Sequence, residues 1–155
     1  MSAYFSFEEL KALKNTEHKK LTTVFYHNWL NKANPHEAFE FTDKIELRFE
    51  DGSRLVVGTS DETEQAIALD PDFDAEKRKL MLLHEFNGKI DQRSVDMTGN
   101  PLWSFAAGQT LLQIALVKEE ENLYRNDAML LDFGDEKLEI RPGMDGLIVE
   151  PFEDI

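Results

Sequence analysis

The stretch IELRFEDGSRLVV, residues 45–57, decides the fold of this chain. Apolar residues alternate with charged ones on both sides of the pair Asp51-Gly52. This alternation has the period of a strand with one buried face. Glycine accepts the positive φ that a tight turn between two strands requires. The stretch therefore predicts a β-hairpin.

Residues 20–29, upstream of the hairpin, fit two interpretations. Leu21, Val24 and Trp29 would share one face of a helix. The β-branched and aromatic residues at 22–26 favour a strand instead. The repeat described below favours the strand. Downstream of the hairpin, residues 66–69 are a plausible further strand.

A short helix precedes these strands. Ser6 is followed three residues later by Glu9, the spacing of a capping box in which each side chain satisfies a free amide at the helix start. Phe5 and Leu10 flank the cap at the spacing of a hydrophobic staple. These signals predict a helix over 7–14.

The middle of the chain predicts a second helix at about 74–87. Asp74 is a good N-cap, and Gly88 follows as a terminator. Residues 91–99 are polar and poorly patterned, which indicates a loop or a weak strand. Asn100 and Pro101 then suit the start of a third helix that ends at Gly108. Further strands are expected at about 110–118, 128–133, 137–141 and 146–151.

The two halves of the chain follow the same plan. Residues 45–49 align with Met129–Phe133, and after a gap of one residue Leu55 and Val57 align with Leu138 and Ile140. We therefore expect an internal repeat over about 5–70 and 99–152. The alternative is that any two hairpins with alternating patterns look alike.

The expected fold class is α+β and β-rich, in a single domain spanning 1–155. Two pseudo-repeated helix-plus-meander units would pack as a barrel or as a two-sheet sandwich, joined by the helix at 74–87. The residues expected to form much of the core are Ile45, Leu47, Phe49, Leu55, Val57, Leu131, Phe133, Leu138, Ile140 and Ile148.

Composition limits the function. The chain has 155 residues, no cysteine and a formal net charge of −14. Disulfides and thiolate chemistry are therefore excluded. The negative field opposes nucleic acid and anionic membrane surfaces and favours a basic partner. With no signal peptide visible at the N-terminus, we expect a cytoplasmic protein of a bacterium. The sequence leaves the oligomeric state open.

No motif for catalysis, metal or cofactor binding is found. The acidic run at 70–74 lacks the glycine and the glutamate that a calcium loop needs. The four histidines show no metal-binding spacing, and no serine lies in a nucleophile motif. We therefore assign no catalytic residue, no metal ligand and no cofactor, and the chain reads more as a binding protein than as an enzyme.

The segment at 47–55 resembles hairpins in several small bacterial domains, some of which belong to toxin–immunity systems. The leading hypothesis is a non-catalytic binding protein, such as an immunity or inhibitor protein, that uses an acidic surface against a basic partner. The alternative is a small-molecule-binding domain or enzyme with a pocket between the two halves. The candidate partner-binding residues are Glu119, Glu120, Glu121, Asp135, Glu136 and Asp145, from the acidic C-terminal third, and Trp29.

Overall fold

The computed structural model describes residues 3–34 and 36–153. Within them the chain forms two helices and a β-rich remainder of antiparallel sheets. The elements in chain order are α1 (Phe7–Thr16), β1 (Leu21–Asn31), β2 (Phe39–Phe49), β3 (Arg54–Thr59), β4 (Ile67–Leu69), α2 (Ala75–Glu85), β5 (Ile90–Asp96), β6 (Gln113–Ala115), β7 (Lys118–Glu120), β8 (Leu123–Tyr124), β9 (Met129–Asp132), β10 (Lys137–Gly143) and β11 (Gly146–Phe152).

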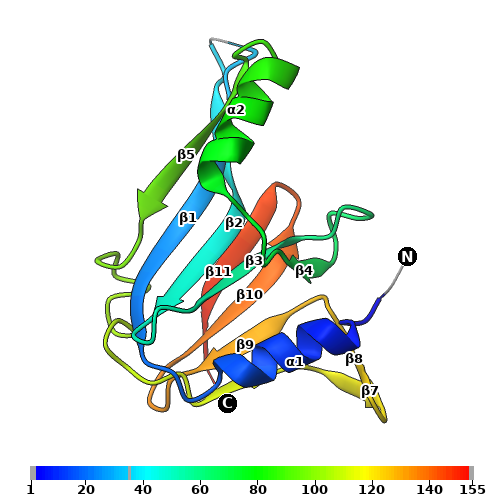
Figure 1. Cartoon of the computed structure of the whole chain (residues 1–155), viewed down its shortest axis with the longest axis vertical. Helices are drawn as coiled ribbons and strands as arrows, with labels where there is room; N and C mark the ends of the chain where they lie inside the picture. Colours follow the sequence, from blue (N-terminus) through cyan, green and yellow to red (C-terminus); the bar gives the residue numbers. More distant parts are fainter. Residues whose placement is uncertain (1–2, 35, 154–155) are drawn as a thin grey trace.

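The strands form two main sheets and one small hairpin (Figure 1). The five-stranded sheet has the order β4-β3-β2-β1-β5, and the four-stranded sheet has the order β11-β10-β9-β6. β7 and β8 pair with each other. The outer ends of β1 and β2, together with β5 and α2, extend beyond the region where the two main sheets meet (Figure 1).

The predicted helix starts are confirmed. At α1, the Glu9 amide donates to Ser6 Oγ at 3.1 Å and the Ser6 amide donates to Glu9 Oε1 at 3.0 Å, which completes the capping box. At α2, the Asp74 carboxylate accepts from the amides of Glu76 and Lys77. Neither helix in the described part of the chain is long and apolar enough to cross a membrane.

Most of the predicted strands are confirmed, but within 110–118 only Gln113–Ala115 (β6) and the first residue of β7 are in strands. The ambiguous residues 21–29 belong to a strand, β1, which pairs with β2 on one side and β5 on the other. The weakly patterned stretch 91–99 begins within β5. The hairpin at 45–57 forms as β2 and β3, and Gly52 in its turn has φ +88°.

The prediction of a helix from Asn100 to Gly108 is wrong. This segment is a series of turns. Asn100 does cap it, since its side chain accepts from the Leu102 amide. The turns do not continue as a helix, because the Gly108 amide donates to Leu21 in β1 and Trp103 is held inside the core.

The sheets are open, so the prediction of a barrel is also wrong. One buried cluster takes side chains from both main sheets. Nine of the ten residues expected in the core are buried, but Ile148 is not. Its neighbour Leu147 is buried in its place, because adjacent residues of a strand point to opposite faces.

The two main sheets contain meanders with the same strand order. β1 to β4 follow one another in the first sheet, and β6, β9, β10 and β11 do so in the second. The residues aligned in the sequence also hold matching places in the strand pairs. These pairs are Leu47 with Leu55 and Ile45 with Val57 in the first meander, and Leu131 with Leu138 and Met129 with Ile140 in the second.

The two meanders meet where their first strands begin. Lys20 and Thr110 form an isolated antiparallel bridge, and His18 and Gly108 beside it have φ of +72° and +85°. Reciprocal backbone bonds flank the bridge. The amides of Leu21 and Leu111 donate to the carbonyls of Gln109 and Lys19, at 2.9 Å each. The Gly108 amide donates to the Leu21 carbonyl at 2.7 Å, and the His18 amide donates to the Leu111 carbonyl at 2.6 Å.

Candidate functional site

The predicted partner-binding residues do not form one surface. Asp135 and Glu136 lie in the turn between β9 and β10, and Asp145 lies in the turn at the opposite end of β10. Glu119 and Glu120 belong to β7, and Glu121 follows it. Trp29 lies in β1, in the other main sheet. The candidate carboxylates of the acidic C-terminal third are therefore spread over three separate hairpins.

The carboxylates of the β7–β8 hairpin bind residues of the chain itself. Glu119 Oε2 accepts a hydrogen bond of 2.8 Å from the Tyr4 hydroxyl, which raises the pKa of Tyr4. Glu121 forms an ion pair of 3.2 Å with Lys118. These contacts satisfy part of the local charge, which makes the hairpin a weaker candidate for a partner.

Trp29 and Asp145, in contrast, come together although they are far apart in the sequence. Both line a cavity of about 400 Å³, with Phe39 and Phe41 from β2. The rings of Trp29 and Phe41 lie 5.6 Å apart between centroids. This cavity, which we call the aromatic cavity, therefore has a wall of aromatic rings and a carboxylate in its lining.

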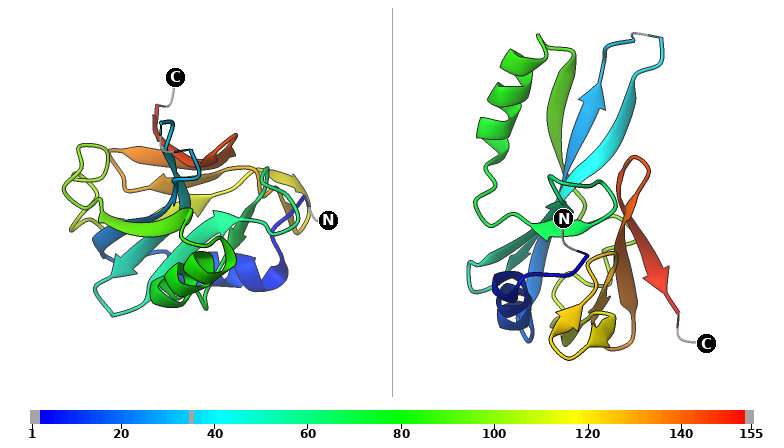
Figure 2. Two further views of the ribbon diagram at one scale, coloured as in Figure 1. Left: turned by 90° about the horizontal axis from the view of Figure 1, so that it is seen from above. Right: turned by 90° about the vertical axis from the view of Figure 1, so that its right-hand side faces the viewer.

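A larger neighbouring cavity of about 1050 Å³ lies between the β3–β4 loop, residues 60–65, and the tip of the β10–β11 hairpin. Its lining includes Ser60, Asp61, Glu64 and Met144, which also line the aromatic cavity. We call the two cavities together the acidic groove. Figure 2 shows the loop and the hairpin tip side by side. The groove is therefore built from both halves of the chain.

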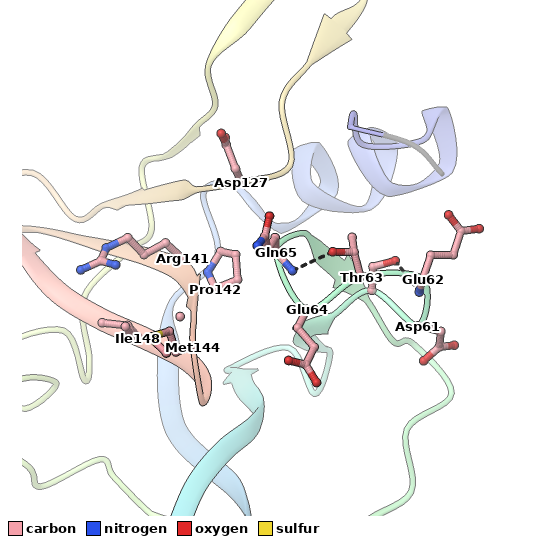
Figure 3. A pocket seen from close by; sticks show the side chains of 12 residues that line it. Asp61, Glu62, Thr63, Glu64, Gln65, Asp127, Arg141, Pro142, Met144 and Ile148 are labelled. Atoms are coloured by element: carbon pink, nitrogen blue, oxygen red, sulfur yellow. Dashed lines mark hydrogen bonds between the residues drawn. The ribbon is translucent and has the colours of Figure 1, made fainter.

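Figure 3 shows how the side chains are placed in the larger cavity. Glu64 and Gln65 extend from the side of the loop nearer to the hairpin, and Asp61 and Glu62 lie at its outer tip (Figure 3). Pro142 and Met144 face them from the hairpin. Of the loop carboxylates, Glu64 thus lies nearest to the hairpin (Figure 3).

The charges of the groove are unbalanced. Its basic residues are neutralised by the chain itself, since Arg78 pairs with Asp43, Lys44 with Asp70 and Arg141 with Glu150. Three carboxylates of the groove, in contrast, form no ion pair or hydrogen bond with any residue that the structure describes. They are Asp61, Glu64 and Asp145.

Gly146 fixes the hairpin against β2. A Cβ atom at this position would overlap Thr42 O and lie 2.8 Å from the Phe41 ring. Gly146 also has φ +93°, which side chains rarely allow. Glycine is therefore required for the close approach that forms this side of the groove.

A second polar cluster lies in the five-stranded sheet. His27 Nε2 lies 2.9 Å from Glu46 Oε1, and His27 Nδ1 lies 2.7 Å from Ser94 Oγ. Glu46 also accepts a hydrogen bond of 2.6 Å from Arg48 Nε and lies 3.5 Å from Arg54. The His27 and Glu46 side chains are each 3% exposed.

Burial and the surrounding charges determine the ionisation of this pair. Burial lowers the pKa of His27, although the hydrogen bond to Glu46 acts in the opposite direction. Burial also opposes the charge of Glu46, but the hydrogen bonds from Arg48 and His27 lower the pKa of this carboxyl overall. Because an ionised carboxylate only accepts, neutral His27 donates from Nε2 and accepts the Ser94 hydroxyl at Nδ1.

This cluster has the connectivity of a Ser–His–carboxylate relay. Three features argue for a structural role instead. The ring of His27 is buried, and Ser94 is absent from the lining of the acidic groove. Arg48 and Arg54 already neutralise Glu46, which leaves little charge to stabilise an imidazolium. We therefore treat the cluster as a partly buried polar network, with His27 and Glu46 inside and Ser94 at the surface, that holds β1, β2 and β5 together.

The lowered pKa of His27 predicts a loss of stability in acid. The unfolded chain binds the proton more readily, so the free energy of unfolding should fall as the pH drops below the ordinary histidine pKa of about 6.5. Urea melts at about pH 7 and pH 5 measure this change. His27→Gln should flatten the profile between these pH values, and the exposed His84→Gln should leave it unchanged. An unchanged slope in His27→Gln would contradict the assignment.

Sequence reasoning missed the β3–β4 loop and the buried pair. A signal for the loop was present, since Asp61, Glu62 and Glu64 lie within six residues between two strands. Glu46 gave the opposite signal, because its alternation with Ile45 and Leu47 is typical of a solvent face. That face is covered by Phe73, whose ring lies 4.8 Å from the ring of His27.

Known proteins give no further guide to the site. No family model, curated protein or solved structure gave a match to this chain.

Proposed function

We propose that the protein is a non-catalytic binding protein whose acidic groove holds a basic segment of a partner protein. The observation that carries the proposal is the set of three carboxylates in the groove without a partner in the described chain, Asp61, Glu64 and Asp145. A basic segment would supply the missing counter-charges. The net charge of −14 would in addition attract such a segment from a distance.

An immunity or inhibitor protein that covers a basic surface of its target would use such a groove. The contact would then lie not at the β7–β8 hairpin but at the groove. There the carboxylates adjoin apolar surface from Phe39, Phe41 and Met144. Interface cores are enriched in aromatic and methionine side chains, and their rims are polar.

The experiment compares two triple variants of matched charge. Asp61→Asn, Glu64→Gln and Asp145→Asn together neutralise the groove. Glu119→Gln, Glu120→Gln and Glu121→Gln remove the same charge from the β7–β8 hairpin. Fluorescence anisotropy with a labelled lysine- and arginine-rich peptide, at low and at physiological salt, measures the affinity of each.

The groove variant should bind about threefold to a hundredfold more weakly, since three exposed ion pairs of about 0.2–1 kcal/mol each are lost. The hairpin variant should lose much less. Binding should weaken with salt, because screening limits exposed charges to about 8 Å at physiological ionic strength. Equal losses in the two variants would show that only net charge matters, and the groove would not be the site.

A small-molecule site between the two halves remains the second candidate. The volume of the larger cavity, about 1050 Å³, lies just above the usual range of about 300–1,000 Å³ for such a site. Its lining is mostly polar and acidic rather than apolar. The basic segment therefore accounts better for the residues present.

We also propose that the two meanders are copies of one unit. The matched strand pairs and the reciprocal bonds around Lys20 and Thr110 support a two-fold relation between them. The groove would then lie between the equivalent third-to-fourth-strand connections of the two copies. In a crystal structure, β1–β4 should superpose on β6 and β9–β11 with Leu47 on Leu131. A better superposition with another pairing would contradict the duplication.

A further inference from the structure

The aromatic cavity of the acidic groove has the composition of a site for a single cationic side chain. The rings of Phe39 and Phe41 are stacked at an interplanar angle of 27°, with centroids 6.0 Å apart, and Trp29 continues the same wall. Asp61, Glu64 and Asp145 also line the cavity. So do Lys44 and Arg78, but each of these is already paired with a carboxylate of the chain. Aromatic faces and carboxylates both attract a cation, and together they favour a planar one.

The chain already places one guanidinium in this cavity. The Arg78 guanidinium lies 5.1 Å from the centre of the Trp29 ring, and its Nη2 lies 3.4 Å from Asp43 Oδ2. Phe39, farther along the same aromatic wall, is 47% exposed, and none of the cations in the described part of the chain is placed over its ring.

We propose that the aromatic cavity is an anchor site for one arginine side chain of the basic segment. The guanidinium would stack on Phe39 and Phe41 and donate hydrogen bonds to the carboxylates opposite. Lysine would keep the charge but lose the stacking plane and the forked donors. This inference rests on the proposed function, since it names the residue type that the groove selects.

The test uses three flexible Gly/Ser peptides that carry the same lysines and differ at one central position. That position holds arginine, lysine or the neutral isostere citrulline. Titration calorimetry at low salt compares their affinities for the wild-type protein, for Phe39→Leu and for Phe7→Leu. Phe7 is a matched control, because it is 75% exposed and lies on α1, outside the residues that line the groove.

The arginine peptide should bind the wild-type protein about tenfold more tightly than the lysine peptide, as expected for a stacked, forked contact. Phe39→Leu should remove this preference and leave the affinity for the lysine peptide nearly unchanged. Phe7→Leu should keep the preference in full.

The possible failures are distinguishable. If the arginine and lysine peptides bind equally well, the anchor site is wrong and the basic-segment function still stands. If the preference survives in Phe39→Leu, arginine is selected elsewhere, and the anchor site is again wrong. If none of the three peptides binds at low salt, both the anchor and the proposed function are wrong.

Discussion

Trp103→Ala is expected to lower the free energy of unfolding by about 3–5 kcal/mol, the usual cost of removing a large aromatic side chain from a core. Trp103 is 0% exposed, and its Nε1 donates a hydrogen bond of 2.7 Å to the Tyr26 hydroxyl. The two rings also meet edge to face, with centroids 6.3 Å apart. The substitution leaves a cavity and removes the hydrogen-bond donor of a partly buried hydroxyl.

Urea unfolding measures this effect, with Trp103→Phe as the control. Phenylalanine keeps much of the apolar volume and loses the hydrogen bond, so its cost should be smaller, about 1–3 kcal/mol. A domain of this size has a total stability of about 5–15 kcal/mol, so the alanine variant should be close to unfolding at moderate temperature. A loss below about 1 kcal/mol would mean that the turns at 100–108 do not anchor the core.

Glu46→Ala is expected to have the second large effect. Removing this carboxylate leaves the guanidinium groups of Arg48 and Arg54 without this ion-pair partner. It also removes the hydrogen-bond acceptor of the buried His27. Breaking a buried ion pair on one side costs about 3–5 kcal/mol, because the partner charges stay desolvated. Arg48 and Arg54 are partly exposed, which places the expected value at the lower end of that range.

The matched control is Glu50→Ala, in the turn directly after the same strand. Glu50 is 66% exposed and pairs with Lys20 at 3.5 Å, so its loss should cost at most about 1 kcal/mol. Guanidinium chloride melts of the two variants give the comparison. Equal effects of the two substitutions would show that the cluster around His27 contributes no more than a surface pair.

The strand pattern could be predicted because one side of each strand faces the core. The alternation at 45–57 predicted the correct register of β2 and β3, and the capping signals at Ser6 and Asp74 predicted where both helices begin. The helix at 100–108 could not be excluded in this way. Its local signals are those of a helix, but its backbone forms hydrogen bonds with β1, which is far away in the sequence.

The candidate site could be predicted only in part. Trp29 and Asp145 were selected separately, for exposure of an aromatic ring and for position in a turn. Their meeting depends on the approach of Gly146 to Thr42, which links the two main sheets. Net charge favoured the acidic C-terminal third, because net charge depends on how many carboxylates a segment has and not on which of them lack partners.

Chemical-shift mapping tests the central claim most directly. Titrating the isotope-labelled protein with the arginine-containing peptide should shift the amide resonances of residues 60–65 and 143–146, on the two walls of the groove. The amides of residues 118–121 and 135–136 should stay nearly unchanged. Shifts confined to 118–121 and 135–136, or spread evenly over the acidic surface, would contradict the assignment of the acidic groove as the binding site.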